Sequence, residues 1–109
     1  MILSGYRAVW IFAMFDLPVD TKSARKAYVD FRKSLLKDGF TMLQYSVYVR
    51  HCASEENADV HYNRINNFLP DDGEVRLITI TDKQFGRMET HWGKMRKPPP
   101  STPRQLELF

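Results

Sequence analysis

Asp16 is the residue whose type and position first point to chemistry. It directly follows an uninterrupted apolar run, residues 8–15, so we expect its carboxylate to project from the end of a buried strand. There it can hold Mg²⁺ through one oxygen while water and a substrate phosphate fill the other positions, and the ion can polarise a phosphodiester. The alternative is an Asx-turn before Pro18, in which the carboxylate only satisfies nearby amides. Taken alone, the spacing favours the turn.

The remaining reactive side chains form no competing site. His51, His61 and His91 lack the spacing of metal ligands, and each is expected to be a surface or partly buried side chain. Cys52 is expected to be a small core residue, because a structural zinc site needs about four ligands. Ser46 has no His/Asp pattern to activate it, so a hydrogen bond to backbone or phosphate is its expected role.

Basic residues gather in two segments of the chain. Residues 22–37 carry six basic side chains and one acid, and residues 83–104 carry six and one, whereas residues 55–74 hold six acids and one arginine. This segregation favours one face for a polyanion and another turned away from it. The alternative is that each basic segment is a solvated helix face. In the first segment one side of the predicted helix carries Lys22, Lys26, Lys33 and Lys37.

Two helices are predicted by apolar residues that step by three and four. The first helix has Asp20 or Thr21 as its N-cap and ends at Gly39, and the second is capped by Ser54. The expected buried residues are Ala24, Tyr28, Phe31 and Leu35 in the first helix and Ala58, Tyr62, Ile65 and Leu69 in the second.

Four strands are predicted around these helices. The run at 8–15 lacks the alternation of a half-exposed strand, so it should be covered on both faces. Within residues 40–50 the apolar phase shifts by one residue, which predicts a turn or bulge near Gln44 and two short strands. The last strand covers residues 74–81.

The resulting order, β-α-β-β-α-β, is that of the ferredoxin-like α+β fold, with both helices on one face of an antiparallel sheet. Helices on one face of the sheet cannot cover a first strand whose side chains are apolar on both faces. A second copy packed on the open face would cover it, so we expect a homodimer. Two copies of Asp16 brought together across a two-fold axis form a plausible metal site, whereas one carboxylate is a poor one.

The C-terminal part has a different character. Residues 82–93 are mixed in composition and are expected to form one more strand, or an arm that reaches the partner. The prolines from 98 onward predict a flexible tail at 97–109, so the domain is expected to span 1–96. The end, Leu106 to Phe109, is either disordered or a peptide that docks by strand addition.

The apolar run at the start is too short to span a bilayer and does not end on a cleavage site. With a single cysteine this predicts a cytoplasmic protein without a membrane partner.

A set of ordered motifs resembles the small CRISPR-associated endonuclease family, the smaller of the two universal spacer-acquisition proteins. These motifs are Phe15-Asp16-Leu17-Pro18, Ala24 to Tyr28 with Phe31-Arg32-Lys33, Gly39-Phe40, and Gln44 to Tyr48. The segment Thr81 to Met88 resembles the version found in type II systems. The resemblance covers residues 6–88.

The resemblance implies a ferredoxin-like homodimer whose C-terminal strand often crosses to the partner's sheet. It implies that Asp16 binds Mg²⁺ at the dimer interface, and that Arg32 and Ser46 contact nucleic acid. It also implies metal-dependent cleavage of RNA or double-stranded DNA, and partnership with the CRISPR acquisition integrase.

Three functional hypotheses remain at this point. In the first the dimer is a Mg²⁺-dependent endonuclease. In the second it is an architectural subunit that bridges the integrase and holds the protospacer duplex through phosphates, with Lys22, Lys26, Lys33 and Lys37 as contacts. In the third it is a monomeric RNA-binding module that stacks bases on an open sheet face.

Overall fold

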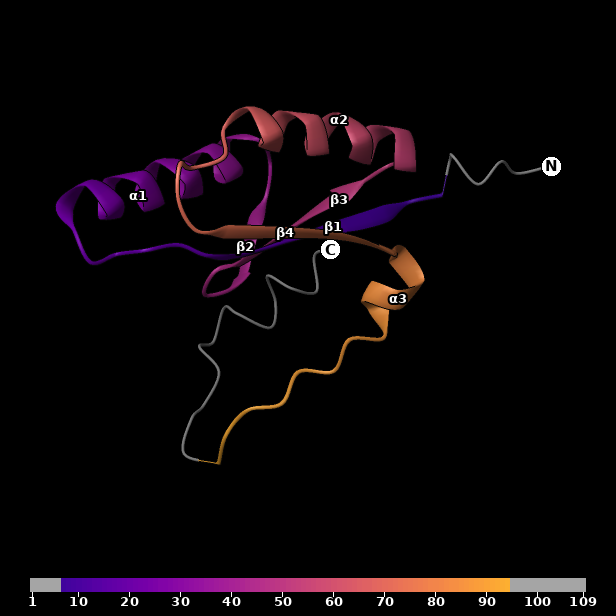
Figure 1. Ribbon diagram of the computed structural model, residues 1–109. Coiled ribbons are helices and arrows are strands. Elements are labelled where there is room, and N and C mark those ends of the chain that lie inside the picture. Colours follow the sequence, from indigo (N-terminus) through magenta and orange to yellow (C-terminus); the bar gives the residue numbers. More distant parts are fainter. Residues whose placement is uncertain (1–6, 95–109) are drawn as a thin grey trace.

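The computed structural model describes residues 7–94. The elements follow the predicted order up to the fourth strand: β1 Val9–Asp16, α1 Lys22–Lys37, β2 Thr41–Gln44, β3 Val47–Cys52, α2 Glu55–Asn67, β4 Glu74–Thr81 and α3 Asp82–Gly86. The strands form one sheet in the order β2-β3-β1-β4, and every neighbouring pair is antiparallel. Helices α1 and α2 lie on one face of the sheet, and α3 lies on the other (Figure 1). The ferredoxin-like fold is therefore confirmed.

Strand β1 lies between β3 and β4 and contributes to both faces. Val9, Ile11, Ala13 and Phe15 belong to the core cluster under the helices. The alternate side chains of Trp10, Phe12, Met14 and Asp16 consequently point to the second face. This two-sided placement explains why the strand is apolar at every position up to its last residue.

Helix α1 begins and ends as the sequence indicates. The Thr21 hydroxyl accepts a hydrogen bond from the Ala24 amide at 2.9 Å, which makes Thr21 the N-cap. Gly39 follows the C-cap with φ of +91°, a conformation that glycine adopts without steric cost. Phe31 and Leu35 are buried, and Tyr28 packs against the core at its margin.

The predicted phase shift between β2 and β3 is confirmed. The register is interrupted between Met42 and Gln44, and Ser46 in the connecting turn has φ of +62°. A serine in this left-handed region is uncommon and marks a tight turn.

Helix α2 corrects two expectations. Leu69 lies beyond the end of the helix and is exposed rather than buried. His61 is buried, not at the surface, and its Nδ1 lies 2.7 Å from Asp38 Oδ2. The Asp38 side chain turns inward at the end of α1, and a buried carboxylate requires a polar partner. His61 of α2 is that partner.

The segment after β4 begins with a helix where the sequence predicted a strand or an arm. Thr81 and Gln84 form a reciprocal capping box that starts α3. Phe85 stacks on Trp10 with ring centroids 3.8 Å apart, and the Trp10 indole N–H donates to Asp82 Oδ1 at 2.8 Å. Helix α3 thus covers one end of the second face of the sheet, and residues 87–94 continue beyond it without regular secondary structure (Figure 1).

The expected tail at 97–109, including Leu106 to Phe109, lies outside the described residues, so the domain limit at 96 stays a prediction. Within residues 7–94, no helix has the length and apolar character needed to cross a membrane.

Candidate functional site

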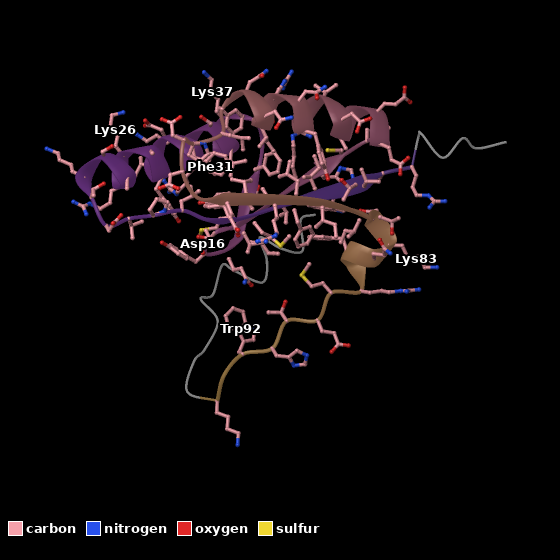
Figure 2. All side chains as sticks on the ribbon, in the orientation of Figure 1. Asp16, Lys26, Phe31, Lys37, Lys83 and Trp92 are labelled. Carbon is pink, nitrogen blue, oxygen red and sulfur yellow. The ribbon has the colours of Figure 1, made fainter. Side chains whose placement is uncertain are left out.

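Asp16 is the last residue of the central strand and lies opposite Glu74 of β4. Its side chain is exposed at one end of the sheet, as Figure 2 shows. The backbone there is held by the turn before β4: a Cβ added at Gly73 would lie 2.8 Å from the Asp16 carbonyl oxygen and 2.7 Å from the Leu17 side chain. This close approach fixes where the carboxylate leaves the sheet.

The Asp16 carboxylate accepts no hydrogen bond from any residue in 7–94. The neighbouring turn instead uses the Asp72 carboxylate, which accepts from the Gly73 amide at 2.7 Å. The Asx-turn interpretation of Asp16 is therefore not what the structure shows. The carboxylate oxygens remain accessible to a ligand.

Ser46 lies beside the end of β1. The Phe15 amide donates to the Ser46 carbonyl at 3.1 Å, and the hydroxyls of Ser46 and Tyr28 are 3.4 Å apart. The turn is thus joined to both the residue before Asp16 and helix α1. The structure brings Ser46 and Asp16 to the same end of the sheet.

Arg32 lies on α1 one turn after Tyr28, because residues four apart are neighbours on a helix surface. It is exposed and forms no hydrogen bond or ion pair with the rest of 7–94. Arg32 therefore lies along α1 beyond Tyr28 and Ser46, and its guanidinium is available to a phosphate.

The lysine stripe is separate from Asp16. Steps of four, seven and four residues keep Lys22, Lys26, Lys33 and Lys37 on one side of α1, and all four are exposed. Lys26 and Lys37 lie on the outer side of the helix, away from the sheet (Figure 2). Lys26 also pairs with Asp30 at 2.8 Å, and the hydrogen bond from this pair raises the pKa of Lys26. In one chain, the lysine stripe and the Asp16 carboxylate therefore lie on different sides of the molecule.

A single chain does not assemble a metal centre within the part that the structure describes: no three His, Cys, Asp or Glu side chains gather there. The acid opposite Asp16, Glu74, is paired with Arg76 at 2.8 Å. Mg²⁺ commonly takes only one or two carboxylates, with water and phosphate at the other positions. The donor chemistry of Asp16 fits such an ion when two copies supply one carboxylate each.

The second face of the sheet carries apolar side chains beyond Asp16, with the charged pair Arg76 and Glu74 beside them on β4. By the strand register, Val47 of β3 and Ile78 of β4 lie on the same face as Phe12 and Met14 of β1. Ile78 is 50% exposed, whereas Trp10 is buried at the end near α3, where Phe85 stacks on it. We call Phe12, Met14, Val47 and Ile78 the open-face patch.

Sequence reasoning missed two features of this region. The pairing of Asp16 with Glu74 depends on the exact register of β1 and β4, which no local motif encodes. Tyr45 is 74% exposed beside Ser46, and no role was predicted for it. The alternation break near Gln44 was the available signal, since a turn at that point takes its neighbours out of the sheet.

These features define a class: small ferredoxin-like α+β proteins with an exposed carboxylate at the end of the central strand. The model of the family described as CRISPR associated protein Cas2 matches residues 9–88. The chain therefore belongs to the Cas2 family, as the sequence motifs indicated.

The sequences of known proteins match this chain over nearly its whole length. A CRISPR-associated endoribonuclease Cas2 of Parvibaculum lavamentivorans is 61% identical over 101 residues, which cover 93% of this chain and all of the relative. A protein of the same description from Flavobacterium psychrophilum is 51% identical over 98% of this chain and 93% of its own. A solved structure described as "Crystal structure of cas2" superposes with a TM-score of 0.58 at 18% identity, over 84% of this chain and 93% of that chain, which supports the fold.

Proposed function

We propose that this chain acts in CRISPR adaptation as a homodimer that binds nucleic acid and bridges the acquisition integrase during spacer integration. It further acts as a Mg²⁺-dependent endonuclease on RNA or double-stranded DNA, with Asp16 of both subunits at the reacting phosphodiester. The observation that carries the proposal is the exposed Asp16 carboxylate at the edge of a sheet face that holds the open-face patch and is covered by α3 only near Trp10.

The open-face patch supports the homodimer. It lies on the face opposite α1 and α2 and includes an isoleucine that is half exposed. Burying apolar surface contributes roughly 25 cal/mol per Å², so a second copy on this face would be stabilised chiefly by these side chains. Because Asp16 ends the same face, a two-fold axis there brings both carboxylates toward one another.

The two carboxylates would hold the ion, and Mg²⁺ when bound would polarise the phosphodiester and make its water more acidic. The chain itself supplies orientation. Ser46 is fixed by the Phe15 amide and can donate its hydroxyl to a phosphate oxygen, and Arg32 can pair with the next phosphate along the strand.

The nuclease activity is further supported by the relatives, which are described as endoribonucleases. A second candidate, an architectural subunit without relevant catalysis, is favoured by a different observation. In the described part of each chain, the carboxylate opposite Asp16 is Glu74, which is already paired with Arg76. The lysine stripe meanwhile points outward and suits the backbone of a duplex.

The test compares Asp16→Asn with Asp20→Asn, which removes the same charge from an exposed residue outside the open-face patch. We expect Asp16→Asn to lower Mg²⁺-dependent cleavage about 100-fold or more, since the metal contributes several kcal/mol to such reactions. Dimer mass and integrase binding should persist in both variants.

Spacer acquisition by the same variants separates the two candidates. Acquisition that survives Asp16→Asn, while cleavage is lost, assigns the architectural role. Acquisition that is lost although the integrase complex still forms assigns the enzymatic role. Unchanged cleavage by Asp16→Asn contradicts the proposed site itself.

A further inference from the structure

Tyr45 occupies the turn between β2 and β3 and is 74% exposed. Isolated exposed aromatic side chains are common on protein surfaces and need no explanation by themselves. The surroundings of Tyr45 are what give its exposure meaning.

One side of the Tyr45 ring is organised by helix α1. The rings of Tyr45 and Tyr28 are stacked, with centroids 6.1 Å apart and planes inclined by 21°. Hydrogen bonding with Tyr28 raises the pKa of Tyr45, and a tyrosine phenol with the ordinary pKa is already neutral at physiological pH. The ring is therefore oriented before any ligand arrives, and it carries no charge that would repel a phosphate.

Polar groups suited to a phosphate lie next to this ring. Ser46 follows Tyr45 directly, and its hydroxyl is 3.4 Å from that of Tyr28. Arg32 lies one turn of α1 beyond Tyr28 and has no ion-pair partner among the described residues. An aromatic ring beside a serine hydroxyl and an arginine is the combination that single-stranded nucleic acids use for base stacking and backbone binding.

The location keeps Tyr45 accessible in the proposed dimer. Tyr45 contacts Tyr28 of α1, so its ring lies toward the helix side of the sheet. The open-face patch lies on the other side. A second copy on that patch would leave Tyr45 uncovered.

We propose that Tyr45, supported by Tyr28, is a stacking platform for an unpaired nucleobase, with the adjoining phosphate bound by Arg32 and Ser46. This inference rests on the proposed nucleic-acid function and adds a base contact to it. Because every base has a π-face, the platform accepts any base in RNA or DNA. A fully paired duplex offers no such base and should not use the platform.

The test measures dissociation constants by fluorescence anisotropy for Tyr45→Ala, Tyr45→Phe and Met42→Ala. Met42 is a matched control, since it is 53% exposed in the adjoining strand. The probes are a single-stranded RNA, a single-stranded DNA, a single strand of abasic sites and a hairpin-closed DNA duplex, each in a salt series.

Tyr45→Ala should weaken both single strands roughly 5- to 150-fold, as expected for loss of one stacked base. Binding of the abasic strand and the duplex should change less than about twofold. Tyr45→Phe and Met42→Ala should stay close to the parent protein, because the first keeps the ring and the second leaves it untouched. The dependence of log K on log salt should not change, since no charge is removed.

Several results would overturn the platform. Equal losses for duplex and single strands would exclude a base contact, and a loss shared by Tyr45→Phe or confined to RNA would assign a hydroxyl contact instead. A change in dimer mass on Tyr45→Ala would assign Tyr45 to a protein interface. If the parent protein and Tyr45→Ala bind the single strands equally well, the platform alone is refuted. If the parent protein binds none of the probes, the proposed function is refuted and the platform with it.

Discussion

Asp38 is a carboxylate placed where the dipole of a helix disfavours it. It is the C-cap of α1, where the helix carries partial negative charge, and its side chain is 8% exposed. His61 lies 2.7 Å from one oxygen and Arg64 donates to the other at 2.9 Å, while Arg50 donates to the Asp38 carbonyl. These contacts join α1 to α2 and β3.

We predict that His61→Leu lowers the free energy of unfolding by about 1–3 kcal/mol, because it leaves a buried carboxylate oxygen without a partner. Arg64→Leu should cost less than about 1 kcal/mol, since the Arg64 side chain is mostly exposed and water can replace it. Urea denaturation of the two variants checks the order, and an equal cost for both would contradict it.

Cys52 predicts a dependence of stability on alkaline pH. Burial raises the pKa of its thiol above the ordinary value of 9.0. The unfolded thiol therefore ionises first as pH rises. The contribution of the protonated thiol is complete below about pH 9 and is lost as the pH rises through the folded pKa.

The parent protein and Cys52→Ala should therefore lose stability differently above pH 9, with the smaller decline in the variant. Urea midpoints at pH 7, 9 and 10.5 measure this, and the parent-minus-variant difference cancels the titration of lysine and tyrosine. A difference that stays constant across the three pH values would show that the thiol does not contribute.

At the scale of elements, the turn before β4 positions the end of β1. Gly73 has φ of +94°, and an added Cβ would meet both the Leu17 side chain and the Asp16 carbonyl oxygen closer than 3.0 Å. Because the Asp16 carbonyl oxygen is a backbone atom, the overlap can be relieved only if the end of β1 and the start of β4 move apart.

We predict that Gly73→Ala lowers the free energy of unfolding by about 1–3 kcal/mol, from backbone strain and steric overlap. Gly86→Ala is the matched control, because nothing lies within 4 Å of its Cβ position and alanine favours helix. The control should be neutral or slightly stabilising. Thermal and urea denaturation distinguish the two, and a neutral Gly73→Ala would mean that the turn adjusts freely.

At the scale of the whole molecule, the sheet has one face covered by two helices and one face covered only near α3. The open-face patch is the region on which the proposed dimer depends. Its most informative position is Ile78, which is half exposed on the edge strand.

We predict that Ile78→Asp converts the dimer to monomer, with the dissociation constant rising about 100-fold or more, because a buried unpaired carboxylate costs several kcal/mol. Val60→Asp places the same charge on α2, at a side chain of similar exposure (44%), and should leave the mass unchanged. Sedimentation equilibrium measures both, and a dimer that tolerates Ile78→Asp would place the interface elsewhere.

Local chemistry was sufficient to predict most of the fold. Thr21, Gly39 and Ser54 mark helix ends by interactions within a few residues, and the shift near Gln44 marks the turn between β2 and β3. Local signals also placed Asp16 at the end of β1. These features depend on neighbours in sequence, so the sequence alone contains them.

Features that depend on distant partners were predicted less well. His61 is buried because Asp38 needs a donor, and α3 forms where Phe85 can stack on Trp10. Neither partner is near in sequence. The roles of Asp16, Arg32, Ser46 and the lysine stripe stay predictions, because they depend on a ligand or a second chain.

The order of the strands in the sheet has a consequence for synthesis on the ribosome. Val9 pairs with Thr81, and the indole of Trp10 donates to a residue 72 positions later. The most apolar strand is made first, yet it lacks one of its two neighbours until nearly all of the domain has been translated. We therefore expect β1 to expose an unpaired apolar edge until β4 has been made, and chaperones that shield such edges would favour correct folding of the nascent chain.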